Sequence, residues 1–177
     1  MSSLQAQSLN TQLQELSDRQ AITELISRLG LMLDQGDFDQ APLILAADVS
    51  VKTPGGYSAG LEEVVAQARR NHTVRTQHLI SDILVELDGD SAVARSNLVV
   101  VFVPDSDQPG ARLSIGGSAE SGARLTVGER YRFTARRGVD GWRLRSVEVA
   151  RIWSSQAVPN GALVQEVAVS PSGDGLP

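Results

Sequence analysis

Apolar residues in the first part of the chain recur at helical spacing. After Ser17, apolar side chains return every three or four positions, at Ile22, Leu25, Ile26, Leu29, Met32 and Leu33. This spacing predicts an α-helix with one apolar stripe. The run Ser17-Asp18-Arg19-Gln20 has the form of a capping box, so we expect the helix to begin at Ser17. The turn from Leu29 to Leu33 is apolar nearly all round, which predicts that it is deeply enclosed.

Two further helices and a short strand are predicted before the pattern changes. Gly36 ends the first helix, and a short second helix is expected over residues 38–46. Residues 49–53 predict a strand, followed by a turn at residues 54–56. Residues 60–70 predict a third helix, whose inner side carries Leu61, Val64, Val65 and Ala68.

The rest of the pattern is typical of β-strands. Residues 74–87 and 91–103 predict one hairpin, joined by Asp88-Gly89-Asp90, and residues 125–136 and 142–153 predict a second. Three helices followed by four long antiparallel strands indicate an α+β fold, in which a curved antiparallel sheet wraps around the three N-terminal helices.

One domain is expected from 177 residues. We assign residues 13–155 to it, residues 1–12 to a flexible N-terminal arm and residues 156–177 to a C-terminal tail. Residues 104–122 are rich in Ser, Gly, Pro and Asp, and we interpret them as a long flexible loop that could lid a cavity.

One predicted strand is apolar on both faces. In the run over residues 91–103, apolar side chains lie on both faces. One face carries Val93, Val99, Val101 and Val103, and the other carries Ala94, Leu98, Val100 and Phe102. One face should meet the helices and the other a partner subunit. We therefore expect a homodimer or a higher homo-oligomer, joined through the outer face of the sheet.

Composition excludes several classes of protein. The chain has no cysteine, which excludes disulfides, thiolate nucleophiles and cysteine-ligated metal sites. A net charge of −5 with interspersed signs gives no electrostatic footprint for nucleic acid or an anionic membrane. No window approaches the roughly 18 apolar residues of a membrane span, and the first residues lack the pattern of a signal peptide. The cytoplasm is the expected location.

Only two histidines can titrate near neutral pH. His72 ends a predicted helix, and we expect it to be exposed. His78 lies on a predicted strand and shares one face with Val74, Thr76 and Ile80, which is more apolar than the opposite face. Its ring should therefore point inward. The alternative interpretation is a core histidine satisfied by one hydrogen bond.

Asp34 lies at the end of the first predicted helix, where a carboxylate faces the negative end of the helix dipole. A histidine across a cavity would offset that cost, whereas a solvated aspartate is the alternative. Glu129 and Tyr131 share one face of a predicted strand, so the Tyr131 hydroxyl could point inward, although a core tyrosine is equally compatible. No phosphate-binding glycine loop, helical zinc pair or nucleophile elbow is present, so no metal and no cofactor is implied.

Three segments together resemble scytalone dehydratase and related SnoaL-like dehydratases and cyclases. They are DQGDFDQAPLILAADVSV from Asp34, the strand TVRTQHLIS, and the last strand GWRLRSVEVARIW, and the resemblance spans roughly residues 14–155. It implies a cone-shaped fold of the nuclear-transport-factor-2 type with an internal pocket for an apolar or polycyclic ketone. It also implies an acid/base pair, whose positions fall on Asp34 and His78.

Some positions of the chain depart from that family pattern. Scytalone dehydratase has two pocket tyrosines. In this chain, the first of these positions is Leu33 and the second falls near Thr53, so both phenols are missing. The second pocket histidine of that enzyme aligns near Val103, and its pocket asparagine falls close to Tyr131. With these departures included, the predicted substrate-binding residues are Leu33, Thr53, Val103, Glu129, Tyr131 and Trp153.

These observations predict an acid/base lyase, cyclase or isomerase that acts on an apolar carbonyl compound, polyketide-like or polycyclic, without a cofactor. His78 would move the proton, and Asp34 would fix the tautomer of its ring and stabilise the imidazolium. Two alternatives stay open. One is a non-catalytic small-molecule-binding or assembly module on the same fold. The other is an epoxide hydrolase in which Glu129 serves as a second carboxylate.

Overall fold

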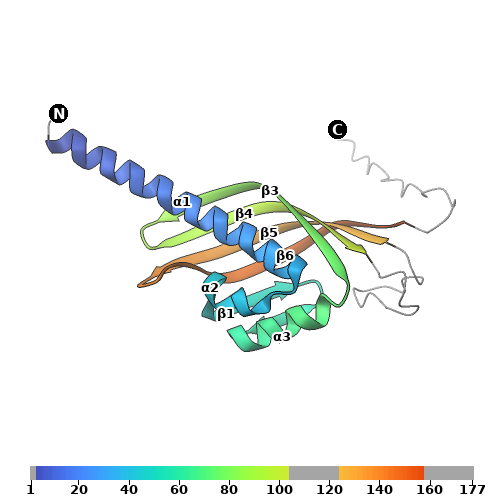
Figure 1. The fold of residues 1–177 in the computed structure, drawn as a ribbon. Helices are drawn as coiled ribbons and strands as arrows, with labels where there is room; N and C mark the ends of the chain where they lie inside the picture. The colour runs from blue at the N-terminus through green and yellow to red at the C-terminus, as the bar shows by residue number, and fades with distance from the viewer. Residues whose placement is uncertain (1–2, 104–123, 158–177) are drawn as a thin grey trace, which may run out of the picture.

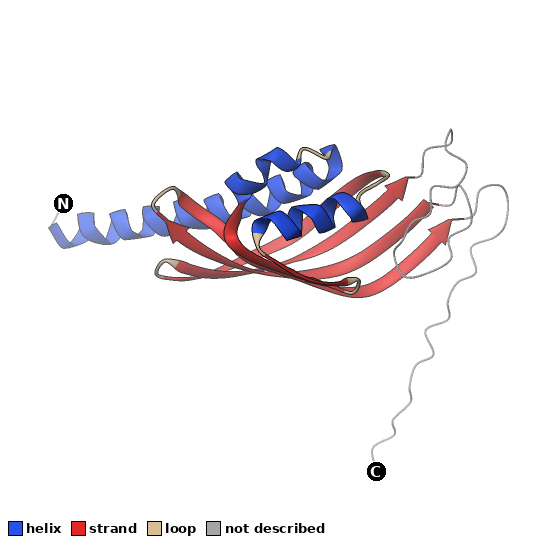
Figure 2. Ribbon diagram, turned by 90° about the horizontal axis from the view of Figure 1, so that it is seen from below, coloured by secondary structure: helices blue, strands red, loops and turns tan. Residues whose placement is uncertain are grey.

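Helices cover one face of a curved sheet in the computed structural model, which describes residues 3–103 and 124–157 (Figure 2). Figure 1 shows the same arrangement with each element labelled. The predicted loop over residues 104–122 lies outside the described residues, and so does the predicted tail, except for residues 156 and 157, which belong to the last strand.

The described strands form one mixed sheet in the order β2-β1-β6-β5-β4-β3. They are β1 (Leu45–Thr53), β2 (Gly56–Ala59), β3 (Arg75–Asp88), β4 (Ser91–Val103), β5 (Arg124–Gly138) and β6 (Gly141–Ala157). The four long strands pair antiparallel, as predicted. The exception is β1, which pairs in parallel with β6. The predicted α+β fold is therefore confirmed, with the correction that its sheet is mixed and includes the unpredicted strand β2.

The helices are α1 (Ser3–Gln35), the short 3₁₀ helix η1 (Phe38–Gln40), α2 (Ala41–Ile44) and α3 (Leu61–Asn71). The helix predicted over residues 38–46 is thus shorter than expected, because β1 already begins at Leu45. Leu45 and Val49 are buried in the core, so the sheet gains apolar contacts that a longer helix would not make.

The first helix begins at Ser3, and the prediction of a capping box at Ser17 is wrong. Leu, Gln, Ala and Glu fill most positions before Ser17, and these residues favour a helix, so nothing ends the helix there. Residues 3–12, predicted as a flexible arm, are helical and exposed. In Figure 1 the N-terminal part of α1 extends past the ends of the strands. The domain boundary at residue 13 stays a prediction.

The predicted apolar stripe of α1 packs on the sheet. Five of its six residues are buried, and Leu33 is half-buried. Leu31 is 55% exposed, so the expectation that the last turn is enclosed all round is wrong for that residue. A second, smaller cluster contains Leu98, Val100, Phe102, Leu125 and Val127 from β4 and β5. No helix in the described part of the chain is long and apolar enough to cross a membrane.

A buried carboxylate ties α1 to the hairpin of β5 and β6. Asp18 accepts hydrogen bonds from Gln14 at 3.1 Å and from the Trp142 indole nitrogen at 3.0 Å, and it pairs with Arg137. Burial raises the pKa of Asp18, but the bonds from Trp142, Arg137 and Gln14 outweigh it and hold the pKa below its ordinary value. Asp18 therefore acts as a tertiary anchor inside the helix and has no capping role.

Removal of this anchor should destabilise the protein. Asp18→Ala leaves the Arg137 guanidinium and the Trp142 N–H without their buried partner, and we expect a loss of about 3 kcal/mol in the free energy of unfolding. Urea denaturation measures it. Glu15→Ala, which removes an exposed partner of Arg19 on the same helix, is the control and should cost less than about 1 kcal/mol. Equal losses in the two variants would refute the anchor.

Candidate active site

Helix α1 approaches strand β3 closely at Gly30. A Cβ atom at this glycine would lie 2.9 Å from Ile80 Cδ1 and 3.4 Å from His78 Cβ. Because Gly30 has no side chain, the helix can lie directly against the strand. Asp34 follows one turn later on the same helix, and its carboxylate reaches the backbone of β3.

The Asp34 carboxylate accepts hydrogen bonds from three donors on β3. The Thr76 hydroxyl lies 2.9 Å from Oδ1, the His78 backbone nitrogen lies 2.9 Å from Oδ2, and His78 Nδ1 lies 2.5 Å from Oδ1. These bonds offset the unfavourable position at the C-terminal end of a helix. The side chain of His78 is only 3% exposed, and that of Asp34 is 22% exposed. The predicted contact between these two side chains is confirmed, whereas their catalytic role stays a prediction.

The environment of His78 keeps its ring uncharged at neutral pH. Burial lowers the pKa of His78 below its ordinary value, and the hydrogen bond and charge of Asp34 offset only part of that effect. In the neutral ring, Nδ1 carries the hydrogen and donates it to Asp34. The other nitrogen, Nε2, then has a free lone pair, as a general base requires.

A cavity of about 200 Å³ lies on the helix side of the sheet, and His78 is part of its wall. A smaller cavity of about 90 Å³ lies beside α1 and α3, and the two have Thr53, Asn71, His72, Tyr131 and Val149 in common. Of the predicted substrate-binding residues, Thr53 and Tyr131 line both cavities, Glu129 lines the larger and Leu33 the smaller. The structure therefore places Thr53, Glu129 and Tyr131 in one cavity with His78, and Leu33 in the neighbouring one.

The other two predicted substrate-binding residues lie on the outer face of the sheet. Val103 lies on the opposite face of β4 from Val100 and Phe102, which line the cavity. Strict alternation along β6 would put Trp153 on the same face as Arg151. The pairing of β6 with β5 is irregular here, because Trp153 pairs with Gly128 while Arg151 pairs with the next residue, Glu129. The Trp153 ring therefore covers the outer side of Gly128, where a Cβ atom would be 2.2 Å from it. The assignments of Val103 and Trp153 to the pocket are wrong.

His72 was expected to be exposed, and that prediction is also wrong. Its ring centre lies 5.5 Å from that of His78 and 6.5 Å from that of Phe102. Its backbone nitrogen and its Nδ1 atom each lie 2.9 Å from the Ala68 carbonyl oxygen, which ends α3. Burial and the nearby His78 lower the pKa of His72. The only sequence signal was its position just after a helix, which does not specify direction.

The cavity also contains an ion pair between Glu129 and Arg151, whose closest atoms are 3.7 Å apart. Burial raises the pKa of Glu129, although Arg151 opposes the shift. Burial, together with the neighbouring carboxylate of Glu129, also raises the pKa of Tyr131, whose hydroxyl is hydrogen-bonded to Glu129. Within residues 3–103 and 124–157, no group of three or more His, Cys, Asp and Glu side chains could hold a metal ion.

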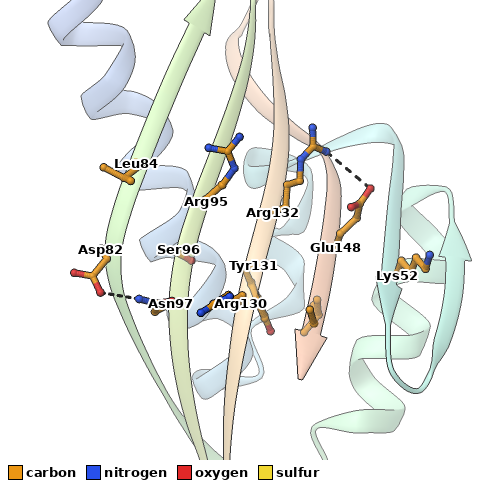
Figure 3. A pocket seen from close by; sticks show the side chains of 12 residues that line it. Lys52, Asp82, Leu84, Arg95, Ser96, Asn97, Arg130, Tyr131, Arg132 and Glu148 are labelled. Atoms are coloured by element: carbon orange, nitrogen blue, oxygen red, sulfur yellow. Dashed lines mark hydrogen bonds and ion pairs between the residues drawn. The ribbon is translucent and has the colours of Figure 1, made fainter. Parts of the chain in front are cut away.

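A larger, open groove of about 640 Å³ lies on the outer face of the sheet (Figure 3). Its polar side chains are partly paired, with Asn97 donating to Asp82 at 2.8 Å and Arg132 lying 4.0 Å from Glu148. Figure 3 shows the helices behind the strands from this side. The groove is thus separated by the sheet from Asp34 and His78.

Comparisons with known proteins agree with this fold. A family model described as the SnoaL-like domain matches residues 14–148. A protein of Novosphingobium aromaticivorans with a cystatin-like fold, described as NTF2-like, is 27% identical over 81% of this chain and 88% of its own, with a TM-score of 0.64. The sequence matches no curated protein.

Two more distant structures share the fold. A hexachlorocyclohexane dehydrochlorinase of type 2 is 15% identical over 88% of this chain and 99% of its own, with a TM-score of 0.71. A candidate scytalone dehydratase of Novosphingobium aromaticivorans is 15% identical over 90% of this chain and 99% of its own, with a TM-score of 0.65. At this level of identity the likeness concerns the fold alone.

The coupling of His78 to Asp34 can be tested without a substrate. Asp34→Asn removes the negative charge that raises the pKa of His78, so that burial should lower the pKa further. An NMR titration of the His78 ring measures the change. Asp37→Asn, which neutralises an exposed carboxylate three residues later, is the control and should leave the pKa nearly unchanged. If Asp34→Asn produces no downward shift, the two groups are not coupled.

Proposed function

The chain belongs to the SnoaL-like domain family, and on this premise we propose that it is an acid/base lyase, cyclase or isomerase. Its substrate is an apolar carbonyl compound, polyketide-like or polycyclic, held in the cavity beside His78. The observation that carries the proposal is the 2.5 Å contact of His78 Nδ1 with Asp34, because it leaves Nε2 unprotonated on a ring that lines the cavity.

In the proposed reaction, His78 Nε2 removes a proton from the carbon next to the substrate carbonyl. The C–H electron pair forms an enolate, and His78 becomes an imidazolium that the Asp34 carboxylate stabilises. Arg151 lines the same cavity and supplies positive charge that can stabilise the enolate oxygen. In an isomerisation, the imidazolium returns the proton to another carbon of the substrate. In a dehydration, the enolate re-forms the carbonyl, the new C=C bond forms as the C–O bond to the β-hydroxyl breaks, and the imidazolium protonates that oxygen, which leaves as water.

The non-catalytic alternative shares the fold and the cavity but gives no role to the dyad. A binding module has no use for a base whose tautomer is fixed by a carboxylate with three donors. The epoxide-hydrolase alternative requires two carboxylates around one water. Glu129 lies in the cavity, but it is paired with Arg151, and Asp34 contacts His78 instead. The acid/base proposal therefore accounts for more of the observed contacts.

The loss of either dyad residue should greatly slow turnover while the protein still folds. With a panel of bicyclic ketones and β-hydroxy ketones as substrates, His78→Ala should lower kcat by about 10² to 10⁴ with little change in KM. Asp34→Asn should be almost as damaging, and the double variant should be no worse than His78→Ala alone. Thermal denaturation checks that each variant folds. Turnover that survives His78→Ala would exclude this mechanism.

We also propose that the protein is a homo-oligomer, joined through the outer face of the sheet. Leu79, Val99, Gly128 and Trp153 are cross-strand neighbours on that face. Leu79 is 52% exposed and Trp153 is 46% exposed, so one chain alone leaves this apolar row uncovered. A second copy would bury it.

Light scattering tests the assembly at micromolar concentration. We expect at least twice the monomer mass for the native protein and the monomer mass for Val99→Asp, because a charge in the apolar row would be desolvated in the interface. Val139→Asp, at a fully exposed hairpin turn, is the control and should leave the mass unchanged. A monomeric native protein would rule out the assembly.

A further inference from the structure

The cavity contains a second imidazole that the proposed mechanism does not use. His72 lies at the end of α3, and its ring lines both cavities. Its Nδ1 atom lies 2.9 Å from the Ala68 carbonyl oxygen. A carbonyl oxygen can only accept a hydrogen bond, so Nδ1 must carry a hydrogen. In the neutral ring, the other nitrogen, Nε2, is therefore an acceptor with a free lone pair.

The surroundings of His72 favour the neutral ring at pH 7. Burial lowers the pKa of His72, and the charge that His78 would carry lowers it further, while the bond to Ala68 and the charge of Asp34 only partly compensate. The other charged groups of the cavity wall are Glu129 from β5 and Arg151 from β6, which pair with each other.

No residue in the described part of the chain uses the Nε2 atom of His72. The hydrogen bond of this side chain is the one from Nδ1 to Ala68. Three side-chain nitrogen or oxygen atoms of the described residues are fully buried without a partner, and His72 Nε2 is not one of them. Phe102 and Val100, on the same wall, offer no polar group. Among the described residues, Nε2 is thus an acceptor without a protein partner on a ring that lines the cavity.

Such an acceptor selects the chemical group that can lie against it. A carbonyl oxygen has no hydrogen to donate, so a ketone gains nothing from Nε2, whereas a hydroxyl gains a hydrogen bond. We infer that His72 is a substrate-binding residue whose Nε2 atom accepts a hydrogen bond from a hydroxyl group of the substrate. The substrate class narrows to a hydroxylated carbonyl compound. The carbonyl group of this substrate class rests on the proposed function, whereas its hydroxyl group is inferred from the position of His72 alone.

Two aromatic ketones of nearly equal size test the inference by binding alone. The probes are 4-hydroxyacetophenone and 4-methylacetophenone, which differ only by a hydroxyl in place of a methyl group. The ratio of interest is the affinity for the hydroxy ketone divided by the affinity for the methyl ketone. We expect this ratio to be about tenfold lower in His72→Phe than in the native protein, which corresponds to about 1.4 kcal/mol. In His78→Ala the ratio should change by less than about twofold. Isothermal titration calorimetry measures both ratios.

The same titrations give the results that would overturn the inference. His78 also has a free Nε2 atom, so a ratio that falls in His78→Ala and stays constant in His72→Phe would assign the hydroxyl to His78. A ratio that is constant in both variants would remove any role for a histidine in hydroxyl recognition. Because these are affinities, they stand even if no turnover is found, which separates this inference from the proposed reaction.

Nitrogen-15 NMR of the native protein avoids any effect of the substitutions on folding. Addition of the hydroxy ketone should shift the Nε2 resonance of His72, and addition of the methyl ketone should leave it nearly unchanged, since only a hydroxyl can donate to the lone pair. A shift confined to His78, or equal shifts of His72 with both probes, would contradict the assignment.

Discussion

The hydrogen bonds of the Asp34 carboxylate to β3 are the interaction on which the rest of the site depends. They hold the last turn of α1 to the strand, one helical turn after Gly30, where the helix lies directly against the strand. The same carboxylate fixes the orientation and the tautomer of the His78 ring. One side chain thus links the packing of the helix to the chemistry of the base, so a change at Asp34 should affect both.

Much of this arrangement could be predicted from local patterns. The spacing of apolar residues shows which face of a helix is buried, and the alternation of side chains shows which face of a strand is buried. The α1 stripe, the two hairpins and the inward direction of His78 were predicted in this way. Asp34 was found because a carboxylate at the end of a helix needs compensation. The failures arose where the residues around a local signal, or an irregularity in strand pairing, overrode that signal. Ser17 lies inside a longer helix, and an irregularity at Gly128 turns Trp153 to the other face.

His72 shows why the missing half of the site could not be read from the sequence. Its position after the last turn of α3 does not determine where the ring points. The packing of α3 against the sheet does, together with the bond from Nδ1 to Ala68. Burial lowers the pKa of both imidazoles of the cavity wall, which favours their neutral forms, and the charges of Glu129 and Arg151 offset each other. A cavity of this kind suits a neutral, largely apolar ligand with a few polar groups.

The account depends above all on the claim that His78 removes a proton from carbon. The most direct measurement is hydrogen exchange at the carbon next to the carbonyl of a bound ketone, such as 4-hydroxyacetophenone in D₂O, followed by proton NMR. The native protein should incorporate deuterium about 10² to 10⁴ times faster than His78→Ala at saturating ketone. Equal rates for the native protein and the variant, with the ketone shown to be bound, would contradict the assignment of His78 as the base.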